Sequence, residues 1–433
     1  MNYFLQIWHS KDLRKKILFT FLIIVIARLL GQVSIIQDKD SLQALQTIFQ
    51  QNQLLGIFSM LTGGSAENFS IILMGLSPYI NASIIIQLLT VIIPKLENLS
   101  KEGEQGRRTL NQYTRLLTIP IAFLQSYGMI ALLNSQSPIP IINNIQAPNV
   151  ILPIMLSVTA GSMLLMWLGE LITEKGIGNG VSLLIFAGII AGIPPIIGNS
   201  LKLVQTDNEK LMPVVIMILA TIALTIIVIL ITEAQRQIPV IYAGHGMRGK
   251  SANSNLPIRV NQAGMIPIIF AVSLVSFPNL LATFLQNSES DTLKNVASFL
   301  NTNFHPDSLL YMLSYFLLII AFTFFYVSIT FNPEQVAENI QKRGGYIPGM
   351  RPGRQTAEYL GKISNRLNLY GGLFIALIAI SPIILGNAFT TVGLGSVPTL
   401  ISGAGLIIIA GVVLELLRQI NAQLVMHDYN KLY

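Results

Sequence analysis

Long apolar runs alternate with short polar segments along the whole chain. Ten of these runs are long enough to cross a hydrocarbon core of about 30 Å as helices, at a rise of about 1.5 Å per residue and with their flanking turns. Proline and glycine mark most of their ends. The pattern predicts ten membrane-spanning helices, over residues 17–36, 71–93, 116–134, 151–172, 179–198, 212–231, 262–285, 309–330, 370–386 and 398–417.

One apolar segment is much shorter than the others. Leu54–Leu61 would extend only about 12 Å as a helix, and a polar turn with two glycines, 62–68, separates it from the run that follows. Lipid cannot satisfy the backbone groups that a broken helix leaves unpaired, so this half-helix belongs inside the protein. Broken helices at membrane depth usually line a cavity or a pathway. The segment therefore predicts an internal pathway around which the other helices are arranged.

Composition agrees with a polytopic membrane protein, because 52% of the 433 residues are apolar and only 11% are charged. The first apolar run has no small-residue cleavage site, which indicates a first span and not a cleaved signal peptide. The chain has no cysteine, which excludes disulfides and thiolate chemistry. Its four histidines stand in four different polar segments, so no metal site and no cofactor is expected.

The distribution of basic residues predicts the orientation. Most of the 27 Lys and Arg fall on the side of the amino terminus, which places both termini in the cytoplasm. The spans divide as five plus five, so two halves of one fold would have inverted topology. We therefore expect an amino-terminal half over 1–198, an external hinge over 199–211 and a carboxy-terminal half over 212–433. Two long basic loops on the cytoplasmic side, 232–260 and 331–369, indicate a docking surface.

Five stretches, spread over nearly the whole chain, carry a resemblance to a known family. They are LSPYINASIIIQLLTVIIP (76–94), EGEQGRRTLNQYTR (102–115), MWLGELITEKGIGNGVSLLIFAGIIAG (166–192), LPIRVNQAGMIPIIFA (256–271) and FFYVSITFNPEQVAENIQKRGGYIPGMRPGRQTAEYL (324–360). In order and spacing they resemble the SecY family, the central subunit of the protein-conducting channel. The resemblance implies an all-α polytopic fold, with ten helices in two inverted five-helix halves around an hourglass pore. It also implies a lateral opening between spans 2/3 and 7/8.

The short segment and its turn, residues 54–70, resemble the family's plug, a half-helix that blocks the resting channel. Three side chains would supply apolar surface to the funnel and two glycines would let the backbone hinge. These residues are Phe58, Met60, Leu61, Gly63 and Gly64. The alternative is an external re-entrant loop that is packed only for stability.

The resemblance also implies an aliphatic ring at the pore constriction. Such a ring can close around a translocating chain and, when closed, exclude water and ions by dewetting. Its members would be Leu76, Ile80, Val181, Ile185, Ile269 and Ile408. The first two pairs are each four residues apart, so each pair lies on one helix face. Ordinary helix packing is the alternative, since aliphatic pairs at this spacing are common in membrane helices.

Polar and ionisable groups within the spans are costly in lipid and point to an interior position. Gln87, Gln125 and Asn261 match polar positions of the family's lateral gate, where they would hydrogen-bond across the closed gate or simply join helices. The ionisable residues Arg28, Glu170 and Glu415 are interpreted as ion-pairing or partner-contact groups.

Basic residues of the two long loops are candidates for docking. Arg351 lies in a turn stiffened by two prolines, and it matches the family arginine that engages the SecA motor. For its neighbour Arg354 two interpretations stay open: it contributes to docking, or it is one of the basic residues usual in cytoplasmic loops. In the other loop, Arg248 and Lys250 stand later than the basic residues by which many relatives contact the ribosome. The G-x-G-x-x-G match at 244–249 lacks a βαβ context and does not indicate a nucleotide site.

These features together predict the pore subunit of a bacterial-type secretion translocase, which is not an enzyme. Expected partners are SecE-like and SecG-like subunits, SecA, the ribosome, signal sequences, nascent polypeptides and membrane lipids. The expected location is the bacterial cell membrane, with a thylakoid copy as the alternative. A secondary transporter for a small solute is the rival function, and it would place charged groups or opposed half-helix ends at the midplane. An intramembrane enzyme would need a nucleophile and base or a metal set, which the sequence does not display.

Overall fold

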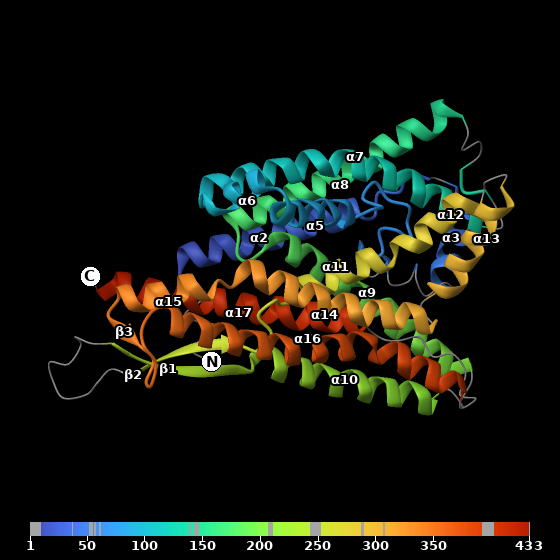
Figure 1. Cartoon of the computed structure of the whole chain (residues 1–433). Helices are drawn as coiled ribbons and strands as arrows, with labels where there is room; N and C mark the ends of the chain where they lie inside the picture. The colour runs from blue at the N-terminus through green and yellow to red at the C-terminus, as the bar shows by residue number, and fades with distance from the viewer. Residues whose placement is uncertain are drawn as a thin grey trace. The chain divides into compact units, whose positions relative to one another are not determined.

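The computed structural model describes the chain except for residues 1–9, 37, 52–54, 56–57, 60–61, 138–139, 143–146, 207–210, 243–252, 287–289, 306–307, 392–401 and 433. The described residues form mostly helices, with one small sheet (Figure 1). Packing divides the chain into two compact units. Unit 1 comprises 1–211, 276–311 and 412–433, and unit 2 comprises 212–275 and 312–411. The two units are defined by which residues pack together, and they do not coincide with the predicted halves 1–198 and 212–433. The division into those halves stays a prediction.

Unit 1 is built mainly from helices. They are α2 (Lys11–Leu30), α3 (Lys39–Gln51), α5 (Ser77–Ile92), α6 (Pro94–Lys101), α7 (Glu104–Gln136), α8 (Pro148–Lys175), α9 (Gly180–Thr206), α12 (Phe277–Gln286) and α13 (Asp291–Asn303). Unit 2 holds α10 (Leu211–Glu233), α11 (Ile266–Val275), α14 (Leu309–Thr330), α15 (Pro333–Lys342) and α16 (Arg354–Thr391). The helix α17 (Gly403–Leu432) begins in unit 2 and ends in unit 1.

Each of the ten predicted spans has a helical counterpart. Seven helices among the described residues are long and apolar enough to cross a membrane, namely α7, α8, α9, α10, α14, α16 and α17. The helix α5 passes the same test together with α6, from which it is bent by 102°. The two remaining predicted spans correspond to α2 and to the apolar helix α11, which continues after a break into α12.

Two predicted spans are not continuous helices in the structure. The run over 71–93 was expected to be helical throughout, but α5 begins only at Ser77. Residues 71–76 form turns, because Gly75 adopts a positive φ of 55° and Pro78 favours the first turn of a new helix. The run over 262–285 is likewise not one helix, since α11 ends at Val275 and α12 starts at Phe277.

The core of unit 1 surrounds the segment that precedes α5. Leu45 and Phe49 of α3, Phe69 and Leu73 of the turn region, and Leu133 of α7 belong to one buried cluster. Most of these side chains are completely inaccessible to solvent. Burial of each such side chain contributes about 1.5–3 kcal/mol, so this cluster fixes the turn region within unit 1.

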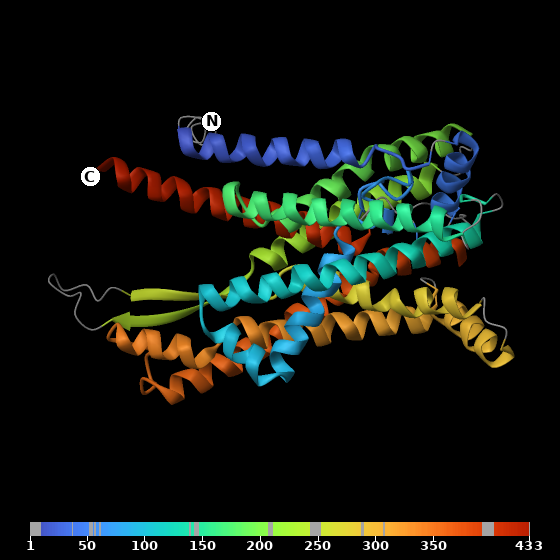
Figure 2. The same ribbon diagram turned by 90° about the horizontal axis from the view of Figure 1, so that it is seen from above.

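Unit 2 contains a three-stranded antiparallel sheet that the sequence analysis assigned to loops. Its strands are β1 (Gln235–Tyr242), β2 (Asn253–Arg259) and β3 (Gly345–Tyr346), in the order β2-β1-β3. In the register Ile238 lies opposite Leu256, and Ile241 lies opposite Tyr346. Figure 2 shows the β1–β2 hairpin beside the orange segment that contains α15 and the start of α16. The two long predicted loops are thus joined by backbone hydrogen bonds.

Candidate functional site

The turn region between the short segment and α5 is built around left-handed backbone. Gly63 and Gly64 have φ values of 69° and 80°, which a glycine adopts without the cost that a Cβ would bring. Phe69 also has a positive φ, 45°, and its side chain is completely buried. The predicted glycine turn is therefore present, and burial of Phe69 holds the chain in a conformation that a non-glycine residue rarely adopts.

Backbone pairing ties this turn to residues 33–35, the segment that follows α2. An isolated antiparallel bridge joins Ser34 to Ser70, and its flanking hydrogen bonds run from Ile35 N to Phe69 O (3.0 Å) and from Ile71 N to Val33 O (3.1 Å). Asn68 Nδ2 donates to Gln32 Oε1 at 3.3 Å next to the bridge. Main-chain and side-chain contacts thus dock the turn on the segment that directly follows α2.

Polar groups also organise the candidate plug internally. The hydroxyl of Ser59 donates to Glu67 Oε1, and the backbone N–H of Gly64 donates to Ser59 O at 2.8 Å. Phe58 is half-buried and packs against the core cluster of unit 1. Met60 and Leu61 lie outside the described residues. The part that is described forms a compact element that closes back on itself.

Of the two roles predicted for Arg28, ion pairing and partner contact, the described residues give no example of the first. Arg28 donates to two carbonyl groups. Its Nη1 donates to Gly63 O at 2.8 Å and its Nη2 donates to Ala187 O of α9. The two acceptors lie 35 and 159 residues away from Arg28 in the chain. No pattern in the sequence predicts contacts between such distant residues.

The candidates for the pore ring are divided between the two units. In unit 1, Leu76 precedes the first turn of α5 and its carbonyl accepts from Ile80 N at 3.0 Å, while Val181 and Ile185 lie on α9. In unit 2, Ile269 lies on α11 and Ile408 on α17. Leu76, Ile185 and Ile408 are buried within their surroundings and the other three are half-buried. Membership of one ring stays a prediction.

The polar residues predicted for the lateral gate make local contacts. Gln87 Nε2 donates to Ser83 Oγ of its own helix at 3.2 Å. Asn261 is buried and its Oδ1 accepts from Gly264 N at 2.8 Å, within its own turn. The Oε1 atom of Gln125 is buried and has no hydrogen-bond partner among the described residues. A buried acceptor without a partner costs about 1–3 kcal/mol, so Gln125 is the member of this set that would gain most from a new polar contact.

Of the two other ionisable residues, Glu170 forms an ion pair as predicted, whereas Glu415 accepts a hydrogen bond from a neutral side chain. Glu170 of α8 accepts from Arg115 Nε of α7 at 2.7 Å, which is an ion pair between neighbouring helices. Glu415 accepts from Gln419 Nε2 at 3.4 Å on the same face of α17.

The loop that carries Arg351 is held firmly at its base. Thr356 Oγ1 donates to Arg351 O at 3.0 Å, and Arg351 N donates to Gln355 Oε1 at 3.4 Å. The side chain of Arg351 is exposed, whereas that of Arg354 pairs with Glu358 at 3.1 Å. Ile347 and Leu360 anchor the loop in the same core as Ile238 and Val240 of β1. Arg248 and Lys250 lie outside the described residues.

Sequence reasoning missed the sheet that supports this loop. The alternation of Ile238 and Val240 with polar or proline neighbours is a strand signal over β1, and both side chains are buried. The basic residues around it made the segment resemble a solvated loop. The sheet makes Arg351 part of a structured surface and not of a flexible connection.

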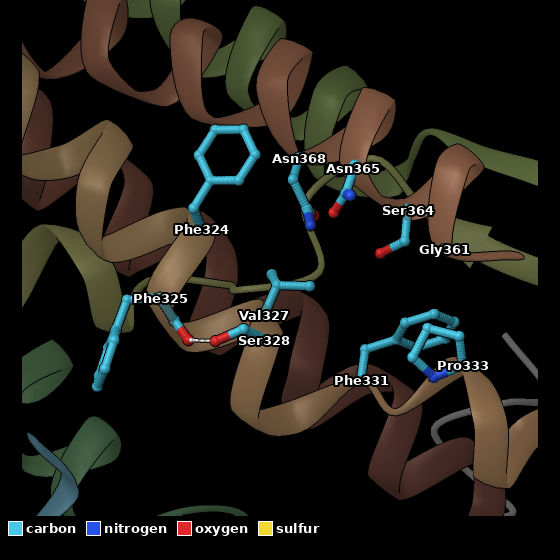
Figure 3. A pocket seen from close by; sticks show the side chains of 10 residues that line it. All are labelled: Phe324, Phe325, Val327, Ser328, Phe331, Pro333, Gly361, Ser364, Asn365 and Asn368. Carbon is cyan, nitrogen blue, oxygen red and sulfur yellow. Dashed lines mark hydrogen bonds between the residues drawn. The ribbon is translucent and has the colours of Figure 1, made fainter. Parts of the chain in front are cut away.

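A cavity of about 550 Å³ lies in unit 2 between α14, the start of α15 and α16. Figure 3 shows Phe324, Val327 and Phe331 on one wall and the polar side chains of Ser364 and Asn368 on the other. Ser364 Oγ donates to Gln262 Oε1 at 3.1 Å, and Asn368 Oδ1 is buried without a hydrogen-bond partner among the described residues. None of the predicted site residues lines this cavity.

Comparison with known proteins identifies the family. The SecY family profile matches residues 70–417. The chain is 40% identical to the protein translocase subunit SecY of Corynebacterium glutamicum over 100% of both chains. It is 41% identical to that of Halalkalibacterium halodurans over 98% of this chain and 97% of the relative. The chain belongs to the SecY family. SecY relatives in other bacteria, such as Bacillus subtilis at 38% identity, match it at similar length.

Solved structures support the fold of this SecY family member. A protein-conducting channel superposes with a TM-score of 0.66 at 18% identity, over 94% of this chain and 91% of the other. A SecY protein solved to study how its plug domain stabilises the closed state gives the same TM-score at 20% identity and the same coverage. Sec61 in a canine ribosome–channel complex gives a TM-score of 0.63. The fold class expected from the sequence is confirmed.

Proposed function

We propose that this chain forms the protein-conducting pore of a bacterial-type secretion translocase. Unfolded polypeptides would pass through the pore, and apolar segments would leave it sideways into lipid. The observation that carries this proposal is the full-length match, at 40% identity, to a relative named a translocase subunit. The chain would act without catalysing a reaction, so the energy would come from a partner or a gradient.

In this proposal, the segment over 54–70 is the plug and the six aliphatic residues form the constriction. Backbone pairing of the turn with residues 33–35, after α2, supports a docked resting position. Leu76 at the start of α5 stands directly after the turn region, so the plug and one ring candidate are joined by a short stretch of fixed backbone. Removal of the plug would leave only the aliphatic ring to resist ion flow.

Different regions of the chain would contact different partners. SecE-like and SecG-like subunits would complete the complex in the bacterial cell membrane, with both termini in the cytoplasm. SecA and the ribosome would dock on the loop that bears Arg351 and Arg354 and on the segment between β1 and β2 that bears Arg248 and Lys250. Signal sequences would enter beside Gln87, Gln125 and Asn261, where apolar contacts would replace weak polar ones of about 0.6 kcal/mol each.

Reconstitution tests this function. The chain would be placed in proteoliposomes with its small partner subunits, SecA and ATP, and a secretory precursor would be scored for protection from added protease. We expect protection that depends on ATP and on the signal sequence, and a new ion leak when residues 57–67 are deleted. A complex that assembles but protects no precursor would contradict the proposal. Uptake of a small solute in its place would favour a transporter.

A further inference from the structure

Arg28 joins three separate elements of unit 1. It lies in the last turn of α2, and its two terminal nitrogens donate to Gly63 O of the plug turn and to Ala187 O of α9. The helix α9 carries two of the pore-ring candidates, Val181 and Ile185. One guanidinium group therefore connects the turn of the plug to a helix of the pore.

The surroundings of Gly63 are shaped to admit this guanidinium. A Cβ at Gly63 would lie 2.3 Å from Arg28 Nη1 and 2.8 Å from Gly188 Cα. The plug turn thus approaches the backbone of α9 directly, and Arg28 fills the space beside the contact. Neighbouring Gly64 has nothing within 4 Å of a Cβ, so the close approach is specific to Gly63.

The helix that bears Arg28 is anchored at its other end. Ile177 N donates to Thr20 Oγ1 at 3.1 Å, and Leu13 packs with Ile177 in a buried cluster. These contacts hold α2 against the segment that leads into α9, so α2 and the start of α9 stay together independently of Arg28.

The chemistry of the contact suits repeated opening. Arginine keeps its charge at all physiological pH values, and its planar fork can bind two acceptors at once. Hydrogen bonds of a charged donor to carbonyls are stronger than neutral ones, yet water can replace a carbonyl acceptor when the turn leaves.

We propose that Arg28 is a positioning residue that latches the plug turn to α9 in the resting channel and releases it on opening. This inference rests on the proposed plug function and deepens it. Loss of one hydrogen bond to a charged group is expected to shift the closed-to-open ratio by about tenfold or more.

A cysteine probe can report the latch, since the chain has no cysteine of its own. Ser65 is 2% exposed in the plug turn and Ser126 is completely buried in α7. Each would be replaced singly by cysteine in resting membranes, and the rate of labelling with a hydrophilic maleimide would be measured with and without Arg28→Gln. We expect labelling of Ser65→Cys to rise about tenfold with Arg28→Gln, with Ser126→Cys unchanged. Arg28→Lys, which keeps the charge but not the fork, is expected to give an intermediate rate.

Opening by substrate completes the test. With a stalled secretory chain in the pore, Ser65→Cys should label equally fast with Arg28 and with Gln at this position, because the latch is already released. Unchanged labelling of Ser65→Cys at rest, in variants that still translocate, would overturn the latch and leave the proposed channel intact. Equal acceleration at Ser126→Cys would also overturn it, since Arg28 would then act on overall folding. Failure of the unmodified chain to translocate would instead contradict the proposed function.

Discussion

At the scale of single residues, Gly63 and Gly64 provide a matched pair. Both have a positive φ, so alanine costs each of them about 1–2 kcal/mol of backbone strain. Only at Gly63 does the new methyl group meet Arg28 and the backbone of α9. We predict that Gly63→Ala increases the resting ion leak in planar bilayers by about tenfold over Gly64→Ala, because it adds loss of an Arg28 hydrogen bond to the shared strain. Equal leaks from the two variants would show that the close approach at Gly63 has no gating effect.

The sequence predicts single-residue features that depend on neighbouring residues, such as turns. It does not predict contacts between residues that are distant in the chain. Two adjacent glycines after an apolar segment predicted a turn, and the positive φ values confirm it. Among the described residues Arg28 shows hydrogen bonds to carbonyls and no ion pair, because the fold brings two backbone acceptors close to it, and its other predicted role, contact with a partner, stays a prediction. Every residue has a backbone carbonyl, so the sequence of side chains does not indicate which carbonyl will accept a hydrogen bond.

At the scale of helices, close packing at glycine predicts a graded loss of stability. A Cβ at Gly161 of α8 would lie 2.1 Å from Ile71 O, a backbone atom that cannot rotate away. Gly161→Ala should therefore destabilise the chain by about 1–3 kcal/mol through overpacking. Gly192→Ala in α9 meets nothing within 4 Å and should stabilise it by about 0.5–1 kcal/mol through helix propensity. Thermal unfolding in detergent measures both, and a Gly161→Ala variant as stable as Gly192→Ala would refute the packing.

The docking loop makes a prediction at the same scale. The backbone of Arg351 is held by Gln355 and Thr356 while its side chain is exposed, so its replacement should leave the loop folded. Arg351→Ala is expected to lower SecA-driven translocation by tenfold or more, the loss typical of one charge-assisted contact. Arg354→Ala is expected to lower SecA-driven translocation less, because this exposed arginine of the same loop is already paired with Glu358 and such pairs contribute under about 1 kcal/mol. Equal effects of the two variants would indicate that only loop charge matters.

The sequence predicts helices well where the apolar runs are long. All ten predicted spans have helical counterparts, since length and apolar content determine them together. The sheet was missed because β3 has two residues and β1 contains a proline, which weakens a strand signal. Pairing of β1 with β3 joins residues about a hundred positions apart, and this is a property of the folded chain alone.

At the scale of the whole molecule, the proposed constriction comprises six aliphatic residues, namely Leu76 just before α5 and five residues on α5, α9, α11 and α17. The family resemblance supplied the fold, and the relatives and solved channels confirm it. The identity of the ring could not be settled from side-chain type, because aliphatic residues also fill every helix interface.

Site-specific crosslinking from Ile80 and Ile408 to a stalled secretory chain tests this central claim most directly. Leu156 of α8 and Leu219 of α10, which are 59% and 61% exposed, serve as controls on outward-facing helix surfaces. The account predicts that the photoreactive group captures the translocating chain at Ile80 and at Ile408, and not at either control. A complex that translocates the chain without capture at Ile80 and Ile408 would contradict the proposed pore.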